Sequence, residues 1–593
     1  MRWGDDFMDV HDADTRYRES LSRRRFLSIA AAGFASAAAT SLLAACGGTT
    51  SSPAATPTAA RSAASASAIQ ATAAGAASSA SAASPQVAQT GSPVAGKKGG
   101  VLHVVYAEEP KNLHPQIDSG TEGVYVGKQI YDGMVNIDAN GKIIPGLAID
   151  LPEHPDELTY IFHLRKDVIF HNGKPFRADD VVWTFDRLMG KFPNLASTQA
   201  DRFKQQIARV EKVDDSTVKI VLTVPWPDFL PLMAGDKYMD IMQQDAEEAN
   251  PKEYGQTIVV GTGPFMFKEW IKGDHITLVR NDKYWGTPAY VDQIVYKATP
   301  EEATRMSSLA AGEIDILFAP ALKDVKKYES DPKFRVQTSD AGNMKIFVFN
   351  TTKMPFTDVR VRQALAYGID RQEIVDAIYY GYATVGQDIL PPWNPSHDPS
   401  KTYYPYDAEK AKKLLADAGY NQSKPLGFEL LTTNVTEFTD LSTLIQAQLQ
   451  RIGVKVTITP LDKSAFTAKI FPQGNTANPG FQADVYRLIF GFATSDYTWR
   501  TYHPNSALDL SGYNQPGGAQ DPAVPKLLDQ AIQATDPQKE KALYGQCSDL
   551  ISQDMPMLLL GFQKNVNISR ADVKNLGITV INNMPLKDVF LDR

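Results

Sequence analysis

The sequence predicts an α/β protein that follows a long N-terminal leader. Residues 101–106, VLHVVY, are mostly apolar on both faces, which is typical of a buried strand. A helical pattern over residues 121–131 comes after the next loop, and strands and helices continue to alternate along the chain. Because roughly 500 residues follow position 98, too many for one hydrophobic core, we expect two or three lobes.

The leader has the layout of a secretory signal. Arg23 and Arg24 stand in SRRRFL, residues 22–27, ahead of an Ala-rich run over residues 29–45. A bilayer span needs about 20 predominantly apolar residues, so this run is too short and too weakly apolar to stay as a membrane helix. SRRRFL resembles the twin-arginine export signal S-R-R-x-F-L, and the modest hydrophobicity of the run suits that route. We therefore expect an exported protein.

Cys46 ends a sequence that is similar to a bacterial lipobox. In LAAC, residues 43–46, that pattern implies that the thiol is diacylated and the preceding peptide bond cut. Two acyl chains meet the usual requirement for stable membrane attachment. Residues 1–46 are thus the predicted signal, and we expect the mature protein to be lipid-anchored to the cell membrane outside the cytoplasm, in the periplasmic space or on the outer face.

The segment after Cys46 is low in complexity. Up to residue 96 it is almost wholly Ala, Ser, Thr, Pro and Gly, with Arg61 its one charged residue. Such a tract has too little apolar bulk to offset the entropy of ordering. Residues 47–98 are therefore the predicted disordered tether.

Charge and cysteine content exclude several classes of function. The formal net charge is -8 at pH 7, which argues against a nucleic-acid partner. Once Cys46 is lipidated, Cys547 is the last cysteine, so no intramolecular disulfide and no cysteine metal cluster can form. Cys547 lies on a helical pattern, YGQCSDLIS, and we expect it to be packed in the core.

The next elements read as a hairpin, then a strand followed by a helix. Residues 140–141, Asn-Gly, stand between two short apolar runs, which is a strong signal for a tight hairpin turn. An alternating strand then leads through a Gly-Lys-Pro turn into a helix that begins near Ala178. Asp179 and Asp180 complement the dipole of that helix.

The sequence carries none of the common enzyme motifs. It has no G-x-S-x-G elbow, no H-E-x-x-H zinc helix, no G-x-x-x-x-G-K-[ST] phosphate loop and no G-x-G-x-x-G after a strand. His163 and His171 lie along one strand and its turn without a third ligand nearby, so we expect structural roles for both. Carboxylates are abundant, but a sequence cannot pair two of them as acid and base. We predict a non-enzymatic protein without a cofactor or metal.

Eight sequence blocks follow one another between residues 99 and 593. The blocks are IYDGMV, PGLAIDL, YIFHLRKDVIFHNGKPFRADDVVWTFDRL, GTGPFMFKEWIKGDHITLVRNDKYWG, PEEATRMSSLAAGEIDI, PFTDVRVRQALAYGIDRQEIV, YDAEKAKKLLADAGY and LIQAQLQRIGVKVTITPLD. In this order they resemble the extracellular solute-binding proteins of family 5, the dipeptide-, oligopeptide- and nickel-type receptors of ABC importers. Arg360, Arg362 and Asp370 fit the charged face of an amphipathic helix, and we interpret them as scaffold.

The resemblance implies a bilobed periplasmic-binding-protein-like fold, type II and similar to the large cluster C proteins, with a subdomain inserted in lobe I. Carried onto this chain, lobe I comprises residues 99–142, 256–345 and 556–593, the inserted subdomain residues 143–255, and lobe II residues 346–555. The turns at residues 261–265, GTGPF, and residues 347–356, FVFNTTKMPF, are expected places for the chain to cross between lobes. Closure about such crossings is a hinge motion, and the ligand would lie between the lobes.

The resemblance also places ligand recognition in residues 486–504, YRLIFGFATSDYTWRTYHP. Relatives that bind peptides carry a pattern like G-W-x-x-D-Y-x-D-P there, whose aspartate pairs with the α-ammonium group of the peptide. Asp496 and Tyr497 match its first half, whereas residues 498–500 replace the second Asp-Pro. Asp496 is therefore either a ligand contact or a turn residue paired with Arg500.

The candidates for ligand contact lie both inside and outside this segment. The full set is Glu108, Trp393, Tyr486, Arg487, Asp496, Tyr497 and Trp499. The aromatic members offer faces suited to a large adaptable pocket, and Trp393 lies in a Pro-rich loop, at a rim or on the ligand. Glu108 follows the first strand at its C-terminal end, where open α/β sheets place ligand sites. Glu109 beside it is interpreted as a loop residue paired with Lys111.

The predicted function is a substrate-binding lipoprotein of an ABC importer that captures a peptide-like or other small polar solute and delivers it to a membrane permease. Capture depends on the different affinities of open and closed states, so no cofactor is needed. A cytoplasmic ATPase partner would supply the energy, because this chain has no phosphate loop. We expect a monomer. The alternatives are an oligosaccharide or metal-chelate receptor, a sensory receptor on the same fold, and a secreted hydrolase.

Overall fold

The computed structural model describes residues 96–593, apart from residues 118–119, 139–141, 196, 471–479, 490–495, 505–508, 516 and 579–584. Arg23 and Arg24 of the predicted export signal, the predicted lipidation site Cys46 and most of the predicted tether lie outside the described residues. Within that part, no helix is both long and apolar enough to cross a membrane.

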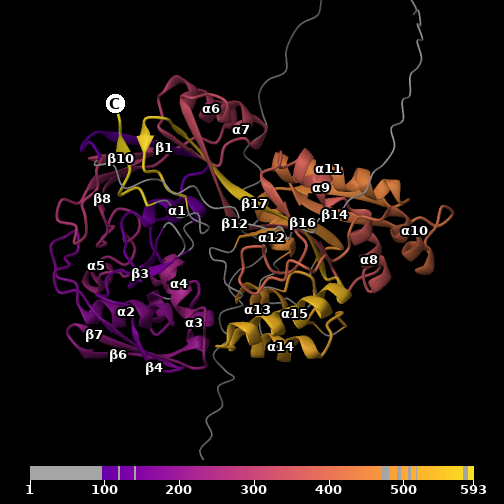
Figure 1. The fold of residues 1–593 in the computed structure, drawn as a ribbon, viewed down its shortest axis with the longest axis horizontal. Coiled ribbons are helices and arrows are strands. Elements are labelled where there is room, and N and C mark those ends of the chain that lie inside the picture. Colours follow the sequence, from indigo (N-terminus) through magenta and orange to yellow (C-terminus); the bar gives the residue numbers. More distant parts are fainter. Residues whose placement is uncertain are drawn as a thin grey trace, which may run out of the picture. The chain divides into compact units, whose positions relative to one another are not determined.

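The largest feature is a mixed sheet of eleven described strands (Figure 1). Across the sheet they are β15 (Lys455–Leu461), β14 (Gly427–Thr433), β16 (Ala483–Ile489), β12 (Phe334–Phe349), β17 (Met557–Arg570), β11 (Ile316–Phe318), β1 (Val101–Tyr106), β10 (Gln293–Ala298), β9 (His275–Arg280) and β8 (Phe265–Ile271), with β13 (Ala383–Val385) paired to β17. β1 is parallel to both β10 and β11, whereas β12 and β17 are antiparallel. Strands distant in sequence thus lie side by side.

β12 and β17 run through both halves of this sheet (Figure 1). Up to Ser339, β12 pairs with the end of β17 that also pairs with β11. The register between β12 and β17 then shifts, and from Asn343 onward β12 pairs with β17 on one side and with β16 on the other. The crossing therefore lies at 339–343. The prediction of a crossing in residues 347–356 is wrong, because β12 already pairs with β16 as far as Phe349. The turn at residues 261–265 does lead the chain into β8.

The half of the sheet around β1 is covered on both faces. Its helices are α1 (Gly120–Gly127), α6 (Glu302–Ala311) and α7 (Leu322–Glu329), and the short pair β18 (Val573–Lys574) and β19 (Phe590–Leu591) adjoins it. Leu102 and Val104 of β1 pack in the core that α1 shares, while Val105 packs toward α6 and α7 on the other face. Burial on both faces explains the almost continuous apolar sequence of β1.

Residues 135–249 build a separate core beside this half. It consists of the antiparallel sheet β4 (Glu153–Asp156), β5 (Thr159–His163), β7 (Thr217–Leu222) and β6 (Ile207–Asp214), the hairpin β2 (Val135–Ile137) and β3 (Ile143–Pro145), and the helices α2 (Ala178–Leu188), α3 (Ala200–Gln206) and α4 (Phe229–Gly235). The helix α5 (Gln244–Ala249) packs its Ala246 into the core of the β1 half. A buried network ties it to the loop after β1: Glu247 accepts from Arg187 Nε at 2.9 Å and lies 3.0 Å from His114 Nε2.

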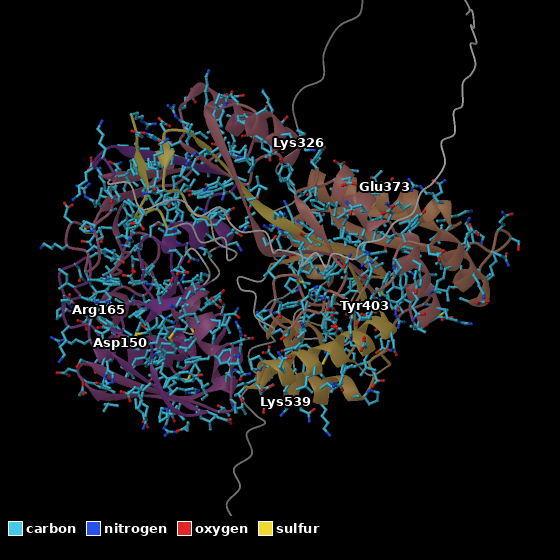
Figure 2. All side chains as sticks on the ribbon, viewed as in Figure 1. Asp150, Arg165, Lys326, Glu373, Tyr403 and Lys539 are labelled. Carbon is cyan, nitrogen blue, oxygen red and sulfur yellow. The ribbon has the colours of Figure 1, made fainter. Side chains whose placement is uncertain are left out.

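The other half of the sheet is also covered on both faces. α8 (Val359–Gly368), α9 (Arg371–Ala377), α10 (Ala408–Asp417) and α11 (Thr436–Arg451) pack on one face, and α12 (Lys463–Ile470), α13 (Asp496–Tyr502), α14 (Ala523–Ile532) and α15 (Pro537–Asp554) on the other. Figure 1 shows the two groups on either side of β14 and β16. The loop before α10 docks on α15, where Tyr403, labelled in Figure 2, donates to Asp549 at 2.6 Å.

The predicted strand over residues 101–106 and the helix start at Ala178 are both confirmed. Asp180 accepts a hydrogen bond from the backbone N–H of Arg177 at 3.0 Å and so caps α2. The predicted helix over residues 121–131 is too long, since α1 ends at Gly127 and the chain continues through turns.

The scaffold interpretation of residues 360–370 is confirmed in role but wrong in form. Arg362 is buried, not on a charged face, and its guanidinium donates to the backbone oxygens of Phe356, at 2.6 Å, and Met555, at 3.1 Å. Asp370 caps a second helix, α9. Cys547 is packed in the core as predicted, and burial raises the pKa of its thiol to about 12.

Candidate functional site

Charged side chains from both halves of the long sheet meet beside the crossing of β12. We call these residues the charge cluster: Glu108, Glu122, Lys345, Glu437, Lys463 and Arg487. They come from the loop after β1, from α1, β12, α11, α12 and β16, so segments far apart in sequence build one group.

The β1 half contributes two carboxylates. Glu108 is exposed, and its Oε2 lies 3.7 Å from Nζ of Lys463, the first residue of α12. Glu122 stands in the first turn of α1 and is partly buried. Burial raises the pKa of Glu122, and the negative charge of Glu108 adds to this, while a hydrogen bond from its own backbone N–H and the charges of Arg487 and Lys463 oppose both. Acidic groups of one half thus face basic groups of the other.

The other half holds a buried ion pair at the base of the cluster. Lys345 on β12 is fully buried, and its Nζ lies 2.5 Å from Oε1 of Glu437 in the first turn of α11. The ammonium also lies 5.3 Å from the ring centroid of Phe438 and 5.6 Å from that of Tyr379. Burial lowers the pKa of Lys345, and Glu437 counteracts it.

Arg487 is the exposed cation next to this pair. It lies directly opposite Lys345 in the β12–β16 register, so both side chains share one face of the sheet. Burial would raise the pKa of Glu437, but Lys345 and Arg487 outweigh it and hold that pKa below its usual value. Glu437 is therefore ionised at neutral pH, and the guanidinium of Arg487 remains accessible to a solute.

The two ion pairs of the cluster differ in strength. Both side chains of the Glu108–Lys463 pair are 69% exposed, and such a pair contributes at most about 1 kcal/mol. Lys345 and Glu437 are held by burial and cannot separate without leaving a buried charge. The Glu108–Lys463 pair can therefore open, so that each side chain is free to contact a polar solute, while the Lys345–Glu437 pair stays in place.

Tyr486 and Arg487, two predicted contact residues on β16, point to opposite faces of the sheet. Tyr486 packs on Phe466 of α12, with ring centroids 5.3 Å apart. Trp393, from the Pro-rich loop, packs edge-on against Phe562 of β17 at 5.2 Å. Glu109 accepts from the Trp270 indole N–H at 2.6 Å and from the backbone N–H of the hairpin residue Gly273, so it fixes the β8–β9 hairpin.

The predicted contact residues on α13 have different surroundings. Tyr497 is buried in the core between the sheet and α12–α15. Trp499 is partly buried, donates its indole N–H to Asp529 at 2.9 Å and stacks on His503 with ring centroids 4.4 Å apart. Trp499 also packs against the core of residues 135–249, so it bridges two cores. The side chain of Asp496 and residues 490–495 lie outside the described part, and its ligand contact stays a prediction.

The sequence analysis missed four members of the cluster: Glu122, Lys345, Glu437 and Lys463. Lys345 could have been found as the single charge in the apolar run MKIFVF. Glu122 and Glu437 stand in first turns of helices, where acidic residues are common for reasons of helix stability alone. Lys463 opens α12, where the helix dipole does not favour a cation, and an exposed lysine there gives no signal of a site.

Two cavities in the described part lie away from the charge cluster. An open groove of about 430 Å³ runs between α14 and α15, lined by Leu527 and Leu550 among others. A small cavity of about 30 Å³ lies beside Asp388 and Tyr502. Among the described residues no three metal-ligating side chains gather, and the ring nitrogens of His171 bond to the backbone of residues 261 and 263.

Comparison with known proteins identifies the family. The model of the bacterial extracellular solute-binding proteins, family 5 (middle part), matches residues 142–519. Heme-binding protein A of Haemophilus influenzae is 31% identical over 494 residues, which cover 76% of this chain and 85% of that protein. The dipeptide-binding protein of Escherichia coli is 27% identical, with 82% of this chain and 94% of that protein covered.

Solved structures agree. The periplasmic binding protein DppA of Helicobacter pylori, solved in complex with the peptide STSA, superposes with a TM-score of 0.72 at 27% identity, covering 84% of this chain and 99% of that one. Members of the family are binding proteins, not enzymes, and they act outside the cytoplasm with an ABC permease. This chain belongs to the bacterial extracellular solute-binding proteins of family 5, has their bilobed fold, and is a substrate-binding protein of an ABC importer.

Proposed function

We propose that this chain is a lipid-anchored receptor that captures a peptide-like solute at the charge cluster. The observation that carries the proposal is the meeting of acidic groups from one half of the sheet with accessible basic groups from the other, at Glu108, Lys463 and Arg487. Such groups suit a small solute that carries both charges. A dipeptide-binding protein and a protein solved with a bound peptide stand among the relatives described above.

The proposed working cycle is a hinge motion about β12 and β17. These strands connect the lobes at 339–343, where the ladder is already irregular, so bending there costs few hydrogen bonds. In the open state Glu108 and Lys463 separate, and in the closed state they approach above the solute. We keep the inserted subdomain at residues 143–255 as part of this proposal, and we move the end of the second segment of lobe I from residue 345 to the crossing at 339–343.

The solute is tested by thermal unfolding of the full chain in mild detergent with pools of di- and tripeptides, oligosaccharides and metal chelates. A ligand at 100 times its Kd stabilises the folded state by about 2.7 kcal/mol. We expect peptides to raise the unfolding temperature. A rise with oligosaccharides or chelates alone contradicts the peptide assignment and leaves the receptor function intact.

The proposed anchor is tested separately by Cys46→Ala. We expect the wild-type chain to sediment with membranes and to be cleaved before Cys46, because two acyl chains hold it there. The variant should lose acylation and the lipoprotein cleavage. A wild-type chain with an intact N-terminus in the cytoplasm would contradict both export and anchoring.

A further inference from the structure

Two apolar side chains of α13 and α14 pack on the core of residues 135–249. Ile532, the last residue of α14, is 8% exposed and belongs to that core, whereas Leu528 and Ala531 of the same helix pack in the core between the sheet and α12–α15. Trp499 of α13 contacts both cores. Among the described residues, every other buried member of the first core lies between positions 134 and 241, so Ile532 reaches it from the other half of the molecule.

Polar contacts hold these two side chains on one side of α13 and α14. Asp529 stands three residues before Ile532 on α14, so both lie on the same face of that helix. Asp529 accepts the indole N–H of Trp499 at 2.9 Å and lies 3.3 Å from Nε2 of His503. The His503 ring stacks on Trp499 with an angle of 11° between the ring planes. The Trp499 ring is therefore held in place by residues of its own half.

The contact joins the two halves at a place separate from the β12–β17 crossing and from the charge cluster. The core of residues 135–249 moves with the β1 half, because the buried network of His114, Arg187 and Glu247 ties it to the loop after β1. α13 and α14 move with the other half, since they pack beside β12 and β16. A rotation that separates the halves must break the contact and expose its apolar side chains to water, which costs free energy.

We propose that Trp499 and Ile532 form an interlobe latch, through which the inserted subdomain sets the balance between the open and closed states of the receptor. The inference rests on the hinge motion of the proposed function and is independent of the identity of the solute. Both are positioning residues: they act on binding through the population of the closed state, and the apparent affinity falls in proportion to that population. This role of Trp499 needs no contact with the solute.

The test measures the distance between the two halves in the full chain without solute. Nitroxide labels on Val213→Cys of β6 and Lys539→Cys of α15 report this distance by pulsed electron resonance. Both positions are exposed, and Lys539 is labelled in Figure 2. A Cys46→Ala background leaves Cys547 as the one other thiol of the chain, and Cys547 is buried.

The variants are Ile532→Ser and Trp499→Ala, two independent changes to the latch. The control is Leu527→Ser, which removes a leucine of α14 that lines the open groove toward α15. We expect Ile532→Ser to lower the ratio of the short-distance to the long-distance population about 10-fold, since the closed state no longer buries a large aliphatic side chain there. Trp499→Ala should shift it in the same direction, and the control should keep the wild-type distribution.

Adding a pool of di- and tripeptides separates the latch from the peptide proposal. A bound peptide should restore the short distance in Ile532→Ser. A shift toward the long distance in the variants without any response to peptides supports the latch and contradicts the peptide assignment. Wild-type distance distributions in both latch variants overturn the latch, whether or not peptides bind. Weaker peptide binding in Trp499→Ala at an unchanged distance makes Trp499 a solute contact and overturns its part in the latch.

Discussion

Glu437→Gln is the change that most directly probes the base of the charge cluster. It removes the carboxylate that lies 2.5 Å from the Lys345 ammonium and leaves that ammonium fully buried. At an effective dielectric constant of about 20, a pair at this distance attracts by about 7 kcal/mol before desolvation. Glu437 is 29% exposed and Arg487 repels the same ammonium, so we expect a net loss of about 3 kcal/mol in the free energy of unfolding.

The loss should depend on pH. Burial lowers the pKa of Lys345 in the folded chain, and the variant lacks the Glu437 carboxylate that counteracts this shift. In the unfolded chain the pKa of a lysine is about 10.4. Between the folded and the unfolded pKa the unfolded chain binds more protons, so the stability of the variant rises with pH in that window. The deficit relative to wild type should therefore shrink toward pH 10.

Urea denaturation at pH 7 and pH 9.5 measures both effects. The control is Glu373→Gln, which breaks the exposed pair between Glu373 of α9, labelled in Figure 2, and Arg451, and should cost at most about 1 kcal/mol. The double variant Lys345→Met/Glu437→Gln should recover most of the stability, because no buried charge remains. A loss in Glu437→Gln no larger than in the control, or a double variant as unstable as the single one, would refute the buried pair.

Three further predictions follow from the contacts described. A double-mutant cycle on Glu108→Gln and Lys463→Gln should give a coupling of at most about 1 kcal/mol in unfolding, since both groups are exposed, and a larger value would mean a fixed lock. Trp499→Phe should cost about 1 to 3 kcal/mol, because the Asp529 carboxylate loses the indole N–H, and an unchanged unfolding midpoint would contradict that bond. Cys547 should resist thiol reagents at pH 8 in the folded protein and react after denaturation, and rapid labelling of folded protein would show that it is not buried.

Local sequence signals were sufficient for β1 and for the start of α2. In both, the deciding interactions lie within a few residues of the chain: apolar side chains on both faces in β1, and Asp180 as a cap in α2. Arg362 shows the limit of such reasoning. Its spacing fits an exposed helix face, yet backbone carbonyls of the loop before α8 and of the end of α15 surround its guanidinium, and no local pattern announces them.

The charge cluster could be predicted only in part. Glu108 was found because it follows the C-terminal end of β1, where α/β sheets place ligand sites, and Arg487 because it stands in the segment to which the family resemblance assigns ligand recognition. Lys345 meets Glu437 only because β12 crosses into the second half of the sheet and α11 packs beside it. Register and crossing are properties of the whole sheet, so the pairing of these charges lay beyond the sequence signal.

The most direct test of the account is retention of solute by the full chain, purified in mild detergent without refolding and examined by native mass spectrometry. We expect wild type to retain a bound peptide, and we expect Arg487→Gln, which alters the exposed cation of the charge cluster, to lose most of it. The control Arg209→Gln, which breaks the exposed pair of Arg209 with Glu211 outside the charge cluster, should retain the peptide. A peptide retained equally in both variants would place the binding site away from the charge cluster.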